Sequence, residues 1–294
     1  MSEVRTYHGQ PVLKEPVWTW EIPCYFFAGG LGGASAGLAY LCELRGEGAA
    51  GRRAWTVALA GIAASPLLLV SDLGRPARFL NMLRMAKVTS PMSIGSWILS
   101  VSGTATTLAA AHAHLGLLPR LARIARPLAA LAGLPLSSYT AALVTNTAVP
   151  VWHEARTTLP FVFVSGAGLS AGAALVLVTP VGDARLARRV ALTGAVGELA
   201  LTEVMQRRLG EPARAYKSGA ARAFDLAARA AITVGGGLLA ARGRHSRPVA
   251  AAAGTLLLAG ALSARWSVFK AGFASAADPT IVIGPQRERL KRAA

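Results

Sequence analysis

Long apolar runs alternate with short polar connections along the whole chain. A run of about 20 mostly apolar residues is long enough to cross a bilayer as a helix. The pattern predicts eight such helices, at residues 22–44, 53–71, 92–115, 128–150, 158–180, 188–206, 223–241 and 248–269. The second run is short, and the sixth carries Glu198 and Glu203. Little of the chain remains for a soluble domain.

The composition agrees with a membrane location. Hydrophobic residues make up 53% of the 294 residues, charged residues only 15%, and the mean hydropathy is +0.44. Soluble domains carry about 25% charged residues. The sequence therefore predicts an all-α integral membrane protein in contact with lipid.

The net charge of +17 would suggest a nucleic-acid partner in a soluble protein. Here Lys and Arg gather in the connections between apolar runs, as is typical of loops beside membrane helices, and we expect no nucleic acid. Eight spans place both termini on one side, which holds 17 Lys and Arg against 12 on the other. This excess favours cytoplasmic termini in the cell membrane. A basic docking surface would produce the same excess, so the orientation stays open.

Residues 1–21 form a polar segment without the apolar core of a cleavable signal peptide. Trp18 and Trp20 suit the aromatic belt at a membrane interface. We expect this segment to lie on the membrane surface or against a partner. The alternative is a disordered tail.

The chain contains an internal repeat. Residues 26–37 (FFAGGLGGASAG) return as 161–172 (FVFVSGAGLSAG), and 73–78 (LGRPAR) return as 209–214 (LGEPAR), at offsets of 135 and 136. A third match, RPLAALAG against RPVAAAAG, has an offset of 121. Internal repeats with an even number of spans are parallel, so two four-helix units related by an axis near the membrane normal are expected.

The repeat divides the chain into two bundles followed by a tail. The first bundle is expected at 22–152, the second at 153–270, and the tail at 271–294. Two GxxxG pairs, Gly29 with Gly33 and Gly168 with Gly172, are interpreted as helix-packing faces, because small residues let helix backbones approach closely in membranes.

Ionisable residues inside or beside the apolar runs are the first functional candidates, since a charge in a membrane is costly. Asp72 has Arg208 at its repeat position, and we weigh proton handling against a salt bridge with Arg75. Glu198 and Glu203 are also candidates for proton handling. They lie about 140° apart around their helix, so one is expected to line a polar cavity while the other meets Arg207 or Arg208.

Glu21, Tyr25 and Tyr139 form a second candidate set. Glu21 and Tyr25 lie one helical turn apart on one face, and Tyr139 belongs to the fourth span. Tyrosine and carboxylate groups can hydrogen-bond quinone carbonyls and exchange protons with them. The alternatives are an interfacial anchor for Tyr25 and a helix-start residue for Glu21.

Haem and iron–sulfur clusters are not expected in this chain, and neither is a protein-held metal. No histidine lies in the middle of a span, as haem held inside a bundle would require. Cys24 and Cys42 share one span about 27 Å apart, too far for a disulfide and too few for a cluster. His153 and Glu154 lack the second histidine of a zinc protease motif. Any redox centre would therefore belong to another chain.

Four segments resemble the NrfD/polysulfide reductase membrane-subunit family. They are EPVWTWEIPCYFFAGGLGGASAG from Glu15, SDLGRPARFLNMLRMAKVTSPMSIGSWIL from Ser71, SYTAALVTNTAVPVW from Ser138 and LPFVFVSGAGLSAG from Leu159. The second segment is quite specific, and the style of the chain is similar to actinobacterial members. The resemblance implies eight helices in two four-helix bundles, a quinone site in the first bundle, and no cofactor of the chain's own.

The resemblance also implies site residues and partners. Tyr139 matches a tyrosine placed at the quinone, Asp72 matches an acidic position implicated in proton movement, and Tyr25 stands where a relative has histidine. This last departure affects the expected headgroup contacts. The implied partners are a ferredoxin-like four-cluster iron–sulfur subunit and a molybdopterin catalytic subunit, formate dehydrogenase-like or polysulfide/thiosulfate reductase-like. Partner docking is assigned to the basic residues Arg75, Arg78 and Arg84.

The leading hypothesis is a membrane anchor that passes electrons between the iron–sulfur subunit and menaquinone or ubiquinone. A secondary transporter built from two parallel repeats is the alternative from another class. Transporters bind substrate near the midplane between repeats, whereas the polar candidates here cluster in the first half and near helix ends. A third possibility is a structural anchor that has lost its quinone site.

Overall fold

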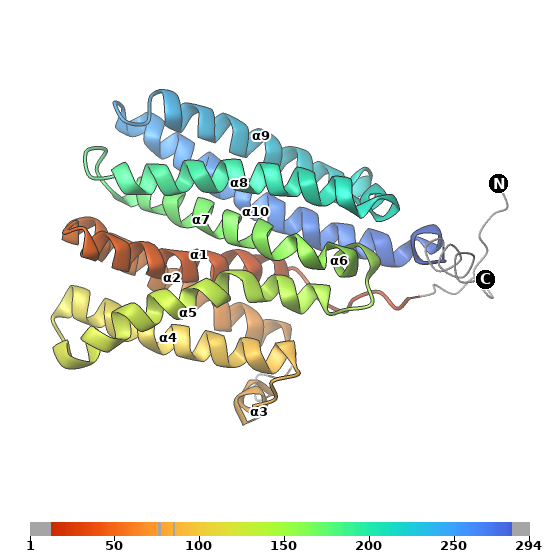
Figure 1. The fold of residues 1–294 in the computed structure, drawn as a ribbon, viewed down its shortest axis with the longest axis horizontal. Helices are drawn as coiled ribbons and strands as arrows, with labels where there is room; N and C mark the ends of the chain where they lie inside the picture. Colours follow the sequence, from red (N-terminus) through yellow and green to blue (C-terminus); the bar gives the residue numbers. More distant parts are fainter. Residues whose placement is uncertain (1–12, 74, 76–77, 85, 284–294) are drawn as a thin grey trace.

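The computed structural model describes residues 13–73, 75, 78–84 and 86–283, and all regular structure among them is helical (Figure 1). The long helices are α1 (Glu21–Leu44), α2 (Gly48–Asp72), α4 (Pro91–Leu115), α5 (Pro119–Thr145), α7 (Leu159–Val178), α8 (Arg185–Leu209), α9 (Gly219–Ala241) and α10 (Arg247–Ala277). Short helices occupy the connections: α3 (Arg78–Arg84), α6 (Pro150–Glu154), η2 (Ala155–Thr157) and η3 (Glu211–Tyr216).

Among the described residues, seven of the long helices have the length and apolarity needed to cross a membrane. This confirms the predicted all-helical, multi-pass membrane protein. α8 has 25 residues and sufficient length, but it is not among the seven. It carries charged residues near both ends and two glutamates between them, so the eighth span stays a prediction.

Several helices extend beyond their apolar runs. α5 begins at Pro119 rather than at residue 128, because the arginines of its first turns, taken for a loop, are helical. Proline is favoured at the first position of a helix, where its missing N–H has no partner to lose. α2 begins at Gly48 rather than at 53, and α10 continues to Ala277 past the predicted 269. The apolar runs therefore predicted the parts of these helices expected in the bilayer, but they did not predict the polar helix ends.

The long helices pack in two rings with the same order of neighbours. In the first half, α1 contacts α2, α2 contacts α4, α4 contacts α5, and α5 contacts α1. In the second half, α7, α8, α9 and α10 make the corresponding contacts. Figure 1 shows the two sets side by side, and α1 joins them by packing on both α7 and α10.

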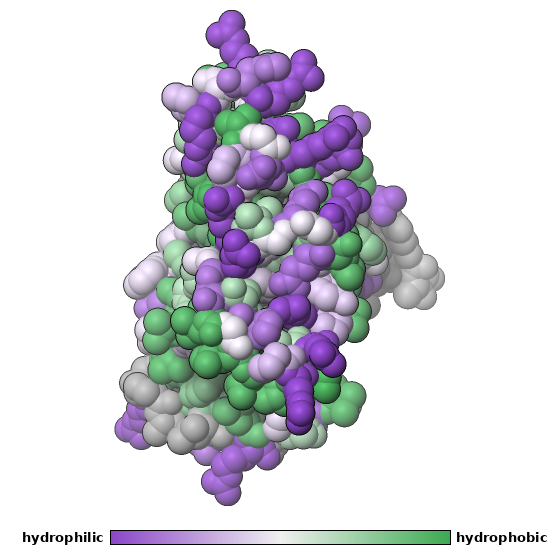
Figure 2. All heavy atoms as spheres, turned by 90° about the vertical axis from the view of Figure 1, so that its left-hand side faces the viewer, coloured by the Kyte–Doolittle hydropathy of each residue, from purple (hydrophilic) through white to green (hydrophobic). Residues whose placement is uncertain are grey.

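The two ends of the bundle differ. Short turns join α1 to α2, α4 to α5, α7 to α8 and α9 to α10 at one end. The longer connections lie at the other end, where α1 begins and α10 ends; we name this the terminus end. Figure 2 faces the short-turn end and shows hydrophilic side chains over much of its upper part. Exposed arginines on the short-turn end are Arg45, Arg52, Arg120, Arg123, Arg185, Arg189, Arg242, Arg244 and Arg247.

The glycines of α1 allow three helices to approach it closely. A Cβ atom on Gly33 would lie 2.6 Å from the carbonyl oxygen of Gly133 in α5. On Gly32 it would lie 2.9 Å from the backbone nitrogen of Ile62 in α2, and on Gly30 it would lie 3.3 Å from Ala167 in α7. Gly32 and Gly33 need to be glycine because the neighbouring helix occupies the side-chain space, and at Gly30 a side chain would fit only tightly.

The second predicted glycine pair is only half correct. A Cβ atom on Gly172 would lie 2.3 Å from the backbone nitrogen of Ala191 in α8, so Gly172 does permit a close crossing. Gly168 has open space around it within 4 Å. Spacing within α7 could not show which of its faces meets a neighbour.

We expect Gly133→Ala to destabilise the first half. The added methyl group would lie 2.3 Å from the carbonyl oxygen of Gly33, and overpacking of this kind costs about 1–3 kcal/mol. Thermal unfolding of the detergent-solubilised protein, followed by helical circular dichroism, measures the loss. Gly37→Ala is the matched control, since nothing lies within 4 Å of that position. Equal midpoints for the two variants would contradict the close α1–α5 packing.

Candidate functional site

Tyr25 of α1 and Tyr139 of α5 meet inside the first half. Their hydroxyl groups are in hydrogen-bond contact, and their rings lie edge to face at 6.5 Å and 68°. Tyr25 is fully buried, and Tyr139 is half-buried. A Cβ atom on Gly95 of α4 would lie 2.0 Å from the Tyr139 ring, so this glycine makes room for the tyrosine. The two predicted tyrosines therefore form one polar spot in an apolar surrounding.

An apolar groove lies between α4 and α5, one helical turn from Tyr139. Its volume is ≈ 380 Å³, which is within the usual range of ligand pockets. Tyr139 does not line it, but Pro135, four residues before Tyr139 on α5, does. A second groove of ≈ 390 Å³ follows along the same two helices and shares Trp97 and Val101 with the first. Together they run along the outer face of the first half.

Thr19 joins the two acidic candidates of the first half. Its hydroxyl is in contact with the Glu21 carboxylate and lies 3.1 Å from Asp72 Oδ1. The Thr19 backbone N–H also donates to Asp72 Oδ1, at 3.4 Å. No local pattern singles out Thr19, because its partner Asp72 is 53 residues away.

The acids and the tyrosines lie one helical turn apart along α1. Glu21 opens the helix at the terminus end, and Tyr25 follows it by four residues. The structure thus gathers Glu21, Tyr25, Asp72 and Tyr139, the four candidates of the first half, near one end of the bundle.

The described part of the N-terminal segment, residues 13–20, packs against the connection between the two halves. Trp18 stacks on Trp152 of α6 with ring centroids 5.6 Å apart. Trp152 is buried and donates its Nε1–H to the Val268 carbonyl at 2.8 Å. Trp20 is 56% exposed, as expected for a residue in an interfacial belt. Trp18 therefore covers the protein interior at this end rather than facing lipid alone.

The two glutamates of α8 occupy different environments. Glu198 is buried in an ion pair with Arg265 of α10, with a distance of 3.1 Å between Oε1 and Nη1. Glu203 is half-exposed and pairs with Arg207 at 2.8 Å and Arg229 at 3.0 Å. Helical geometry had indicated this separation, but Arg229 and Arg265 were missed. Both arginines could have been selected from the sequence, because each is a charged residue inside an apolar run.

The proposed docking arginines lie at the terminus end. Arg75 and Arg84 are exposed beside α3, and the side chain of Arg78 lies outside the described residues. Within the described part of the chain, no three His, Cys, Asp or Glu side chains gather as a metal site would require.

We expect the hydroxyls of Tyr25 and Tyr139 to be energetically coupled. A double-mutant cycle with Tyr25→Phe and Tyr139→Phe, measured by thermal unfolding, should give a coupling of about 0.5–1.5 kcal/mol, the usual contribution of a hydrogen bond. Tyr40→Phe combined with Tyr139→Phe is the control, since Tyr40 lies near the opposite end of α1. Additive effects in the first cycle would show that the two hydroxyls do not interact.

Comparison with known proteins places the chain in a family. Residues 6–208 match the family described as "Polysulphide reductase, NrfD". No curated protein matches the chain. The family match covers more than half of the 294 residues and includes Tyr25, Asp72 and Tyr139. The chain therefore belongs to the NrfD polysulphide reductase family, and it is a quinone-related, multi-pass membrane subunit of an oxidoreductase complex.

Proposed function

We propose that this chain binds a membrane quinone at Tyr25 and Tyr139, where the quinone exchanges electrons with an iron–sulfur subunit. The observation that carries the proposal is the contact of two buried or half-buried tyrosine hydroxyls, with an apolar groove one helical turn from Tyr139. A quinone has two carbonyl groups on a ring and a long apolar tail. The apolar groove between α4 and α5 can accommodate the apolar tail, and the tyrosine hydroxyls can donate hydrogen bonds to a carbonyl oxygen.

The tyrosines would orient the headgroup. Each hydroxyl can donate one hydrogen bond, so a carbonyl oxygen between them would replace their mutual contact. Burial strengthens such hydrogen bonds because water does not compete. When bound, the quinone supplies two-electron chemistry: it takes up two electrons and two protons to become the quinol, or releases them in reverse.

The Glu21, Thr19 and Asp72 contact supports a proton route at this site. A hydroxyl can accept a hydrogen bond from one acid and donate to another, so Thr19 can pass a proton between the two carboxyl groups. Asp72 lies at the end of α2, toward the water of the terminus end. Protons of the quinone reaction would leave or arrive through this pair.

The terminus end is the proposed docking face for the partner. The N-terminal segment, α3 and α6 lie there, with the exposed Arg75 and Arg84. We propose a ferredoxin-like four-cluster iron–sulfur subunit at this face, joined to a molybdopterin catalytic subunit of formate dehydrogenase-like or polysulfide/thiosulfate reductase-like type. Electrons would then travel only a short way between the nearest cluster and the tyrosine pair.

We further propose that the two halves are parallel repeats and that α8 is the eighth span. The identical order of helix neighbours in the two rings supports this arrangement. Glu198, near the middle of α8, is buried, and Glu203, nearer the helix end, is ion-paired with Arg207 and Arg229.

Copurification tests the function directly. The chain, tagged at its C-terminus, is purified from native membranes in mild detergent, and its companions are identified by mass spectrometry and solvent extraction. We expect stoichiometric iron–sulfur and molybdopterin subunits together with menaquinone or ubiquinone. Recovery of this chain alone, without quinone, would favour a secondary transporter instead.

Asp72→Asn should slow quinone-coupled turnover of the intact complex by at least about tenfold, because a positioned acid or base usually contributes 10²–10⁴-fold. The amide keeps the shape of the side chain and its contact with Thr19 but cannot carry the proton. Asp183→Asn, on an exposed side chain at the short-turn end, is the control. Equal turnover in both variants would remove Asp72 from the mechanism.

A further inference from the structure

The second half contains a buried carboxylate that is only partly satisfied. Glu198 and Arg265 have side-chain exposures of 1% and 3%, and Glu198 Oε1 accepts a hydrogen bond from Arg265 at 3.1 Å. The other oxygen, Oε2, is buried and has no hydrogen-bond partner among the residues that the structure describes. Buried polar atoms are nearly always hydrogen-bonded, so this oxygen calls for an explanation.

The Arg265 guanidinium has two further contacts besides Glu198. Its Nη2 donates to the Phe163 carbonyl at 3.1 Å, and its guanidinium lies 4.3 Å from the centroid of the Phe163 ring. Gly166 of α7 makes room for the pair, because a Cβ atom there would lie 2.2 Å from Arg265 Nη2 and 2.5 Å from Glu198 Oε2. The Phe163 carbonyl and ring therefore hold the guanidinium through contacts that do not involve the carboxylate.

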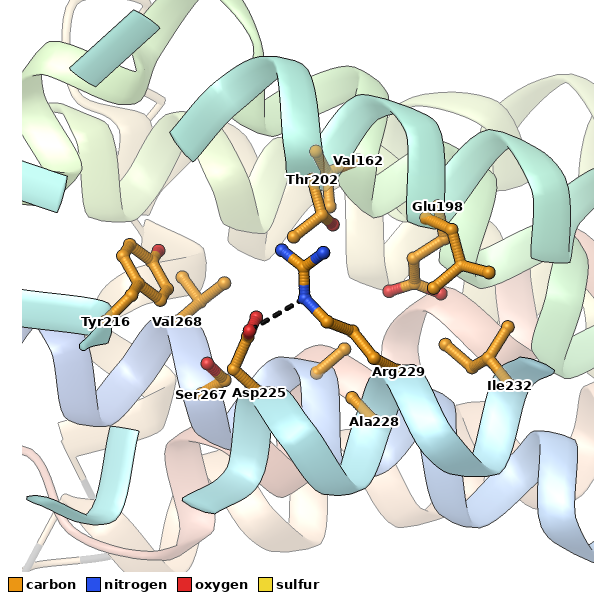
Figure 3. A pocket seen from close by; sticks show the side chains of 12 residues that line it. Val162, Glu198, Thr202, Tyr216, Asp225, Ala228, Arg229, Ile232, Ser267 and Val268 are labelled. Atoms are coloured by element: carbon orange, nitrogen blue, oxygen red, sulfur yellow. Dashed lines mark hydrogen bonds and ion pairs between the residues drawn. The ribbon is translucent and has the colours of Figure 1, made fainter. Parts of the chain in front are cut away.

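A small cavity with both apolar and polar lining lies between Glu198 and the terminus end (Figure 3). Its volume of ≈ 20 Å³ is enough for about one water molecule. Tyr216, Asp225 and Arg229 line it together with Glu198. Figure 3 shows the Arg229 side chain between the Glu198 and Asp225 carboxylates.

Polar contacts continue from this cavity to the surface. Arg229 bonds Asp225 at 2.8 Å and Glu203 at 3.0 Å. Glu203 in turn bonds Arg207, whose side chain is 78% exposed. In the other direction along the bundle, α9 and α10 contribute the buried apolar side chains Ile232, Leu257 and Ala261, and the hydroxyl of buried Ser170 on α7 is bonded to the Gly166 carbonyl. The polar route therefore opens toward the terminus end.

The charges around the cavity favour one bound proton. Three carboxylates (Glu198, Glu203 and Asp225) face two guanidinium groups that are buried or half-buried (Arg229 and Arg265). Arg207 adds a third positive charge, but it is solvated at the surface. η3 contributes Tyr216, whose pKa is raised by burial and then by Asp225, so its phenol stays neutral. From α7, Gly166 and Phe163 contact the pair, and neither is titratable.

We infer that Glu198 is a proton-loading site of the second half, reached from the terminus end and separate from the tyrosine site. A proton from water at that end passes the Glu203, Arg229 and Asp225 cluster and one water in the cavity, and binds Glu198 Oε2. It leaves by the same route, and no electron moves. A metal cation is disfavoured there because the neighbouring Arg229 and Arg265 guanidinium groups carry positive charge. The inference does not depend on the quinone reaction.

Infrared difference spectroscopy tests the site on the purified full-length chain in detergent. Spectra recorded across a pH titration report the carbonyl band of each protonated carboxylic acid. We expect a titrating band that shifts in D₂O and is lost completely in Glu198→Gln. Glu43→Gln, on an acid at the opposite end that bonds Trp55, is the matched control and should keep the band.

Glu198→Gln leaves Arg265 charged and unpaired, which threatens folding. The double variant Glu198→Gln/Arg265→Gln removes both charges and should also lack the band, whereas Gly166→Ala should displace it. A band that persists without Glu198 would overturn the inference. The absence of any titrating band that differs between the wild type and Glu198→Gln would also overturn it, because the ion pair would then be permanently charged and purely structural.

Discussion

The approach of three helices to the glycine run of α1 is the contact on which the rest of the structure depends. Lipid tails are as apolar as leucine side chains, so helices associate in a membrane through close packing of small residues rather than through the hydrophobic effect. Gly30, Gly32 and Gly33 point to α7, α2 and α5 in turn. That packing fixes α5 against α1, and so it brings Tyr139 to Tyr25.

Much of this arrangement could be predicted from the sequence, and the remainder could not for a physical reason. Apolar runs located the helices, and residue chemistry selected Tyr25 and Tyr139. The partners of these residues depend on how each helix is rotated about its axis, which a linear pattern leaves undefined. Arg265 and Thr19 were missed for that reason, although a charge inside the last apolar run could have drawn attention to Arg265.

The two halves share one helix order but place their polar groups differently. At the repeat offsets of 136 and 121, Glu198 and Arg265 correspond to Ile62 and Val144 of the first half, both buried and apolar. At the offsets of 135 and 121, Tyr25 and Tyr139 correspond to Pro160 and Gly260. Each half has therefore specialised its interior, with a pair of tyrosines in one and a pair of charges in the other.

The spacing of these contacts along the chain also sets the order in which they form during synthesis. The contact of Thr19 with Asp72 closes once α2 has emerged, and the tyrosine pair, 114 residues apart, closes once α5 has followed. The bond from Trp152 to Val268 waits for the last helix. Since chains generally fold from their N-terminal part as they are made, all elements that carry the tyrosine site are available before the second half has been synthesised.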